Sequence, residues 1–146
     1  MEAGTENRVT VTVVPVQKMT SNLFKEVMAL IEKAVENSEG LHTLETVAQW
    51  IEDESLHVWV AIDDDGLQGC FLTEVIPVAK GMDLNVPYVG FKKNFKALND
   101  SMKELLRVAR ESGYRSLRFI SSDERVGSFA KRHGMRRRFI EYVGEF

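Results

Sequence analysis

Glu74 is the residue whose surroundings in the sequence most favour acid–base chemistry. It stands in an otherwise apolar predicted strand that runs from Gln68 to Ile76. Burial in such a strand disfavours the charged form of a carboxyl group and raises its pKa toward the range in which a general base works. Asp83, at the start of the next predicted strand, is the second candidate. The alternative for both residues is a position on the polar side of the strand, facing solvent.

A glycine followed by several lysines precedes the longest predicted helix, which lies within residues 94–112. The residues of interest in this segment are Gly90, Lys92, Lys93, Asn94 and Lys96. The unpaired N–H groups and the dipole at a helix N-terminus attract phosphate, and lysine charge adds to this attraction. The segment is therefore a predicted phosphate contact, and a basic surface loop is the alternative.

The charges of the chain are distributed unevenly, although the net charge is only −3. Residues 1–91 hold 5 Lys and Arg against 15 Asp and Glu, whereas residues 92–138 hold 14 Lys and Arg against 5 Asp and Glu. Such asymmetry favours an anionic partner for the carboxyl half: a phosphate-bearing cofactor, nucleic acid or an acidic protein surface. Solvated helix and strand faces would explain the same pattern without a partner.

Histidine and cysteine give no sign of a metal site. His42, His57 and His133 are scattered without ligand spacing, so we expect ordinary surface or capping histidines. Cys70 is the single cysteine, which excludes an intramolecular disulfide, and its apolar strand predicts an inert core residue. The chain also lacks a Walker phosphate loop and a dinucleotide fingerprint.

The length of 146 residues predicts a single domain over residues 1–146, with residues 1–7 as a flexible terminus. Apolar residues make up 44% and charged residues 28%, which is typical of a soluble globular chain. The first residues lack the basic and apolar regions of a signal peptide, and no apolar run approaches the roughly 18 residues of a membrane span. We therefore expect a cytoplasmic protein without membrane contact.

The elements that must position these residues follow from the spacing of apolar side chains. Period-two patterns predict strands, and three- to four-residue spacing predicts helices that end at glycines such as Gly40 and Gly113. The predicted strands are Arg8 to Val16, Leu56 to Ile62, Gln68 to Ile76, Met82 to Phe91, Leu117 to Ile120 and Met135 to Val143. The predicted helices are Ser21 to Val35, Thr43 to Asp53, one within Asn94 to Ser112, and Asp123 to His133. The order is β-α-α-β-β-β-α-β-α-β.

This order resembles the GNAT superfamily of acyl-coenzyme A-dependent acetyltransferases over nearly the whole chain. The most specific part runs from Leu105 through Gly113 to Gly134-Met135, where a helix, a glycine, a strand, a short helix and a terminal Gly-Phe-like pair follow one another. The resemblance implies an α/β fold with a central mixed, largely antiparallel sheet. It places the long helix on one face and the two early helices on the other. The strand Leu72-Thr73-Glu74-Val75 is also similar to short, divergent GNAT-like proteins of bacteriophages and prophages.

The resemblance further implies transfer of an acetyl group from acetyl-CoA to a small amine or a protein amino group. Glu74 would then serve as the base that deprotonates the ammonium, and backbone N–H groups from Val86 to Val89 would polarise the thioester carbonyl. Lys93 matches the basic position of the family's phosphate loop. Lys96 and Leu98, however, stand where the family has glycines, so the loop is atypical.

The family's proton donor to the departing thiolate is also missing. Ala130 stands where many members carry a tyrosine on the short helix, and Phe129 beside it becomes a predicted cofactor contact. Tyr142 on the last predicted strand, or Tyr88 near the expected opening of the sheet, could substitute if either lies within hydrogen-bond reach of the sulfur. Tyr142 is the predicted catalytic acid.

Two other classes of function remain open. The first is a catalytically degenerate GNAT fold that acts as a virion-associated or host-interaction binding module. The second is a nucleic-acid-binding module that uses the basic run from Lys131 to Arg138, although this run lacks interleaved aromatic residues. The sequence leaves the oligomeric state open, with a homodimer as one option.

Overall fold

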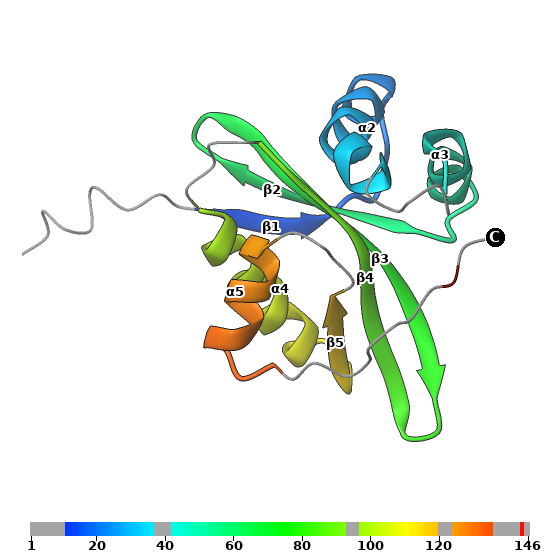
Figure 1. The fold of residues 1–146 in the computed structure, drawn as a ribbon. Helices are drawn as coiled ribbons and strands as arrows, with labels where there is room; N and C mark the ends of the chain where they lie inside the picture. The colour runs from blue at the N-terminus through cyan, green and yellow to red at the C-terminus, as the bar shows by residue number, and fades with distance from the viewer. Residues whose placement is uncertain (1–10, 37–41, 93–96, 120–123, 136–143, 145–146) are drawn as a thin grey trace, which may run out of the picture.

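The computed structural model describes residues 11–36, 42–92, 97–119, 124–135 and 144. Their elements follow the predicted order (Figure 1). They are β1 (Thr12–Pro15), α2 (Ser21–Glu36), α3 (Leu44–Glu52), β2 (His57–Asp63), β3 (Gly66–Val78), β4 (Gly81–Phe91), α4 (Leu98–Glu111), β5 (Ser116–Phe119) and α5 (Glu124–Arg132). The predicted last strand, Met135 to Val143, lies outside the described residues apart from its first residue.

Local sequence signals set several of these boundaries. The hydroxyl of Thr43 accepts a hydrogen bond of 3.1 Å from the N–H of Thr46 and so caps α3. Gly113, with a φ of +87°, follows α4 in the left-handed conformation that ends many helices. Pro15 ends β1, an edge strand of the sheet, where a missing N–H is tolerated. None of the described helices has the length and apolar character needed to cross a membrane.

The five described strands form one mixed sheet in the order β1-β2-β3-β4-β5. The first three neighbouring pairs are antiparallel, and only β4 and β5 are parallel. A parallel pair needs a crossover connection, which here contains α4. The predicted mixed, largely antiparallel α/β fold is confirmed.

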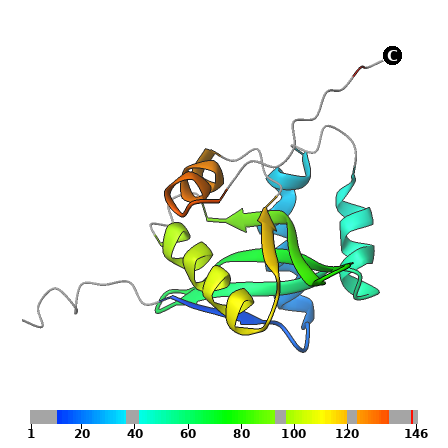
Figure 2. The same ribbon diagram turned by 90° about the horizontal axis from the view of Figure 1, so that it is seen from below.

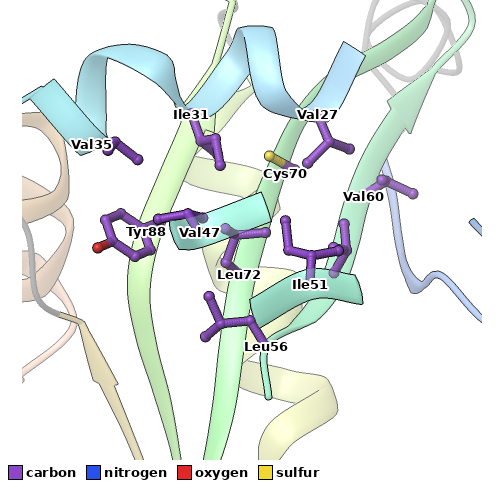
Figure 3. Packing of buried hydrophobic residues seen from close by; sticks show 11 residues of the cluster. Val27, Ile31, Val35, Val47, Ile51, Leu56, Val60, Cys70, Leu72 and Tyr88 are labelled. Carbon is purple, nitrogen blue, oxygen red and sulfur yellow. The ribbon is translucent and has the colours of Figure 1, made fainter. Parts of the chain in front are cut away.

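Two hydrophobic layers cover the sheet, as the sequence predicts. Helices α2 and α3 lie on one face, and α4 and α5 lie on the other (Figures 1 and 2). The buried residues of the first layer, most of which Figure 3 labels, are Val27, Ile31, Val35, Val47, Ile51, Leu56, Val58, Val60, Cys70, Leu72 and Tyr88. Those of the second layer are Val13, Ala61, Phe71, Val86, Leu98, Met102, Leu105, Val126 and Phe129. We call these the α2/α3 layer and the α4/α5 layer.

The β3–β4 hairpin extends beyond the other strands (Figure 1). Its pairing with β2 ends at His57 opposite Thr73, whereas β3 continues to Val78. Side chains alternate along a strand, so Glu74 points to the same face as Leu72 of the α2/α3 layer. The hairpin thus carries Glu74 just past the apolar part of that layer.

Candidate active site

The described pairing of β4 with β5 covers only the first half of β4. It runs from Asp83 opposite Ser116 to Val86 opposite Phe119, where the described part of β5 ends, while β4 continues to Phe91 along β3. Beyond Val86, β4 has no partner on that side among the described residues. Unpaired main-chain N–H and C=O groups of a strand are a ready binding edge for an extended ligand. We call this part of β4, residues 87–91, the splay.

A β-bulge in β4 lies at the start of the splay. Leu72 pairs with Tyr88 and Glu74 pairs with Asn85, so one residue of β3, Thr73, lies opposite two of β4. The extra residue falls at Val86–Pro87. Because of it, Val86 and Tyr88 point to opposite faces of the sheet, although residues two positions apart in a regular strand share a face. Bulges of this kind are common next to active sites.

The bulge brings polar side chains from β3 and β4 together on the α2/α3 side of the sheet. The Asn85 amide Nδ2 donates a hydrogen bond of 2.7 Å to Glu74 Oε1. The Tyr88 hydroxyl is hydrogen-bonded to Nδ1 of His42, the residue before the cap of α3. His42, Glu74, Asn85 and Tyr88 form what we call the rim cluster. It lies next to Val86, the last residue of β4 with a described partner in β5.

Tyr88 occupies the boundary between the apolar layer and this cluster. Its side chain is buried with 5% exposure, and in Figure 3 its hydroxyl oxygen points away from Val47 and Leu72. Desolvation by burial, and then the negative charge of Glu74, raise the pKa of its phenol. Tyr88 is therefore protonated at neutral pH and can both donate and accept a hydrogen bond. The His42 ring also meets the edge of Trp50, with the ring centroids 5.1 Å apart.

Asp83 is not a base, which corrects its position as second candidate. Its side chain is fully buried instead of facing solvent. Arg115 binds both carboxylate oxygens, with Nε donating at 3.0 Å and a terminal nitrogen at 2.8 Å, and Arg118 adds a third contact. The hydrogen bonds from Arg115 are the main reason why the pKa of Asp83 falls to about 2. Asp83 is therefore an anion at neutral pH, and its ion pairs tie β4 to β5.

Close packing explains why a glycine stands at position 90. A Cβ at this position would lie 2.4 Å from the carbonyl oxygen of Leu30 in α2. The glycine therefore allows α2 to approach β4 closely. This contact explains the residue without a bound phosphate, and its predicted cofactor contact stays a prediction.

The other predicted cofactor contacts are only partly within the described residues. Val86 is buried in the α4/α5 layer, and Val89 is half-buried against it. Lys92 is exposed, and its main-chain N–H donates to the carbonyl of Gln68 at 2.9 Å, which leaves its ammonium group as the potential phosphate ligand. Three predicted contacts and the predicted acid lie outside the described residues: Lys93, Asn94, Lys96 and Tyr142.

The N-terminus of α4 lies directly after this lysine segment. Its N-cap is Ala97, and no side chain makes a capping hydrogen bond there within the described part of the chain. The first N–H groups of a helix need an acceptor and carry partial positive charge. Arg132 of α5 reaches the same end of α4, donating to the amide oxygen of Asn99 at 3.0 Å.

Phe129 lies in the interior of the α4/α5 layer. It is fully buried, and its ring meets those of Phe119 at 6.3 Å and His133 at 4.3 Å between centroids. Core packing accounts for this residue, and its cofactor contact remains a prediction. The description of Cys70 as an inert core residue is confirmed, because burial raises the pKa of its thiol to about 12.

His42 and Asn85 are the residues of the cluster that the sequence did not single out. His42 was expected to be a surface or capping histidine, yet it lies against Tyr88, which is 46 positions away in the chain. Its position just before the Thr43 cap of α3 was the available signal, but the partner depends on tertiary packing. Over the described residues, no group of His, Cys, Asp or Glu could hold a metal ion.

A pocket of about 550 Å³ lies elsewhere, along the side of α4 that carries Lys103 and Arg107. Val11 and His133 are also among its lining residues, and no residue of the splay or of the rim cluster lines it. The rim cluster is therefore separate from this pocket.

No protein-family model and no curated protein matches this sequence. Solved structures of acetyltransferases, in contrast, match its fold. A ribosomal-protein-alanine N-acetyltransferase from Brucella melitensis biovar Abortus 2308 has a TM-score of 0.67 at 14% identity, over 95% of this chain and 99% of that chain. An aminoglycoside N-acetyltransferase in complex with CoA has a TM-score of 0.61 at 14% identity, over 96% of this chain and 98% of that chain.

A predicted acetyltransferase with acetyl-CoA from Clostridium acetobutylicum has a TM-score of 0.56 at 13% identity, over 92% of this chain and 96% of that chain. At identities this low, the structural match shows a shared fold and nothing more. The chain therefore has the fold of the GNAT acetyltransferases, as the resemblance in the sequence implies.

Proposed function

We propose that this protein is a GNAT-type N-acetyltransferase, which transfers the acetyl group of acetyl-CoA to an amine. The observation that carries the proposal is the splay, the part of β4 past its described pairing with β5, beside the rim cluster. A strand edge that could hold an extended ligand, next to a carboxylate that can accept a proton, would meet the two requirements of acyl transfer to an amine.

The cofactor would lie on the basic side of the opening. Acetyl-CoA supplies the activated thioester when it is bound. Lys92 and the N-terminus of α4 are the described groups that attract its phosphates, and Lys93, Asn94 and Lys96 are proposed to complete this contact. The extended pantetheine arm would lie along β4 beyond its described pairing with β5, and the main-chain N–H groups there would polarise the thioester carbonyl.

The acceptor would approach from the α2/α3 side, where Glu74 acts as the base. Asn85 holds Oε1 of Glu74, which orients the carboxylate and leaves Oε2 to take a proton from the acceptor ammonium. A small amine or a protein amino group would be such an acceptor. Tyr142 is retained as the proposed acid that protonates the departing thiolate.

Binding of acetyl-CoA is the first test. Calorimetry with acetyl-CoA should show binding, and the melting temperature should rise with cofactor concentration because a ligand that binds only the folded state stabilises it. No heat and an unchanged melting temperature at millimolar cofactor would exclude the proposal.

Turnover is the second test, measured as thiol release with a set of amines and basic peptides. Glu74→Gln keeps the hydrogen bond to Asn85 within reach but removes the base, so kcat should fall roughly 100-fold or more. Asp64→Asn, an exposed carboxylate in the β2–β3 turn, is the matched control and should be active. Cofactor binding without turnover for any amine would favour the binding-module alternative, including a virion-associated or host-interaction role.

A further inference from the structure

We infer that the acceptor of the acetyl group is a free amino acid, whose ammonium group binds Glu74 and whose carboxylate binds Arg118. This inference rests on the proposed function and names the class of substrate that the same site accepts. It gives Arg118 of β5 a second partner besides Asp83.

Glu74 and Arg118 stand in one row across three neighbouring strands. Asn85 of β4 lies opposite Glu74 of β3 on one side and opposite Arg118 of β5 on the other. Directly paired residues point to the same face of a sheet, so all three side chains are on the α2/α3 side. The row crosses the β3–β4 hairpin past the end of the β2 pairing, where the hairpin extends beyond the other strands (Figure 1). We call these three residues the charged row.

Positive charge is in excess at the Arg118 end of the row. Arg115 donates to both oxygens of Asp83, at 3.0 and 2.8 Å, and so balances this carboxylate by itself. Arg118 makes a further contact with Asp83, and neither arginine has an ion pair with another carboxylate within the described ranges. Two guanidinium groups therefore share one carboxylate. Removal of such surplus charge from water is costly, and an anionic ligand at Arg118 would offset this cost.

The guanidinium of Arg118 has room for another partner. It carries five N–H donors, and its contact with Asp83 involves one terminal nitrogen. Its Nε is buried and has no hydrogen-bond partner among the described residues. The side chain as a whole is 27% exposed, so a ligand on the open face of the hairpin can reach it. A planar guanidinium with unused donors is well suited to a carboxylate.

Negative charge is in excess at the other end of the row. The carboxylate of Glu74 is half-buried, and its Oε1 accepts a hydrogen bond from the neutral amide of Asn85. Glu74 has no ion pair with a cation in the described part of the chain. One face of the sheet thus presents an unbalanced carboxylate and an unbalanced guanidinium. This arrangement is complementary to a molecule that carries both an ammonium group and a carboxylate.

The spacing of the row favours a free amino acid over a protein acceptor. Neighbouring strands lie about 4.8 Å apart, so the main chains at Glu74 and Arg118 are about 10 Å apart. An α-amino acid with one hydrogen bond at each end has a comparable span. A lysine side chain within a protein has no carboxylate at this distance from its amino group. The cationic end of the amino acid would meet Glu74, where its proton is removed.

Acetylation of free amino acids and of their amides by the unaltered protein is the first test. For the same side chain, kcat/KM should be about 30-fold higher for the acid, because a hydrogen-bonded charge pair with Arg118 is lost in the amide. The amide has the less basic amine, so amine basicity alone would favour the amide. Equal or better turnover of amides, or of amines without a carboxylate, would overturn the inference and leave the proposed function intact.

Replacement of Arg118 tests the residue itself. Arg118→Gln should raise KM for the amino acid by about tenfold or more, with little change in KM for acetyl-CoA, and should reduce the preference for acid over amide to within about threefold. Arg118→Lys keeps the charge and should keep part of the preference. Arg107→Gln, an ion-paired arginine on α4, is the matched control and should keep all of it. A folded Arg118→Gln, judged by its melting curve, that retains the full preference would contradict the inference. If this variant does not fold, Arg118→Lys and the comparison of acids with amides decide.

Nuclear magnetic resonance tests the contact without turnover. The Nε–H signal of Arg118 should shift when free amino acids are added to the unaltered protein, with or without CoA, and should not shift with their amides. The Nε–H signal of Arg107 should stay unchanged with both. An Arg118 signal that no amino acid shifts would overturn the inference. Absence of acetyl transfer to every amine would overturn the proposed function, and the Arg118 signal would then decide the carboxylate contact separately.

Discussion

The two layers that cover the sheet differ in charge and in the kind of core they build. Helices α2 and α3 carry five acidic and two basic residues, whereas α4 and α5 carry four acidic and six basic residues. These two pairs of helices lie on opposite faces of the sheet (Figure 2), so the uneven charge along the sequence becomes a difference between the two sides of the molecule. An anionic cofactor and a cationic acceptor would be drawn to opposite sides of the splay.

The cores differ as well. The buried α2/α3 layer is mainly aliphatic and ends in the polar rim cluster. The α4/α5 layer contains a set of touching aromatic rings, with Phe71 between Phe91 and Phe119 and with Phe119 against Phe129. Packed aromatic rings fill one side of the sheet, while the other side places polar groups at the edge of its core. The two faces of one sheet thus differ in what they expose at their borders.

The largest expected effect concerns the aromatic side. Phe129→Ala should lower the free energy of unfolding by about 3–5 kcal/mol, because it leaves a cavity in a fully buried position. Urea denaturation measures this loss, and Phe129→Leu should lose clearly less. A change within about 0.5 kcal/mol for Phe129→Ala would indicate a surface residue and would contradict this packing.

The next effect concerns the ion pair between β4 and β5. The pKa of Asp83 is about 2 in the folded protein against an ordinary 3.8, so its contribution to stability is present above pH of about 4 and is lost as the pH falls through about 2. The melting temperature should therefore drop over this interval. Asp83→Asn should have a lower melting temperature at neutral pH and a shallower decrease in acid. Parallel curves for the two proteins would show that Asp83 is not the group responsible.

Gly90→Ala probes the contact of α2 with β4. The added Cβ meets the main chain of Leu30 and should lower the free energy of unfolding by about 1–3 kcal/mol. Gly127→Ala is the matched control, since Gly127 lies in α5 with open space around it and alanine should stabilise that helix by about 0.5–1 kcal/mol. Equal changes in the free energy of unfolding for the two variants would contradict the close approach of α2 to β4 at Gly90.

The smallest effect concerns the basic side. Lys92→Ala should weaken acetyl-CoA binding by about fivefold, because an exposed charge contributes up to about 1 kcal/mol. Lys92→Ala/Lys93→Ala should weaken it further, and added salt should reduce both differences. Calorimetry measures these affinities, with Lys80→Ala at the tip of the β3–β4 hairpin as the control. If replacing both lysines leaves the acetyl-CoA affinity unchanged, the phosphates do not bind at this segment.

The sequence predicted the fold closely because periodic apolar side chains and glycines act locally. The helix predicted from Ser21 to Val35 spans Ser21–Glu36, and the strand predicted from Met82 to Phe91 spans Gly81–Phe91. The candidate site was harder to predict from the sequence than the fold. Glu74 was found from its apolar strand alone, but its Asn85 partner depends on the register across the hairpin.

Long-range contacts explain what the sequence could not provide. Asp83 looked like an ionisable strand residue, and only the fold brings Arg115 and Arg118 to it from more than 30 positions away. His42 meets Tyr88 for the same kind of reason, because the start of α3 packs over β4. Gly90 was interpreted through its neighbouring lysines, whereas the approach of α2 is visible only in three dimensions.

The bulge at Val86–Pro87 has a consequence for the kinetics of ligand binding. Pro87 has no N–H, so a strand that closed over this part of β4 would lack one main-chain donor. Pairing along this part of β4 would therefore be incomplete in the free protein as well. Stopped-flow traces should accordingly show an observed binding rate that rises linearly with acetyl-CoA concentration, without the plateau that a slow opening step would impose.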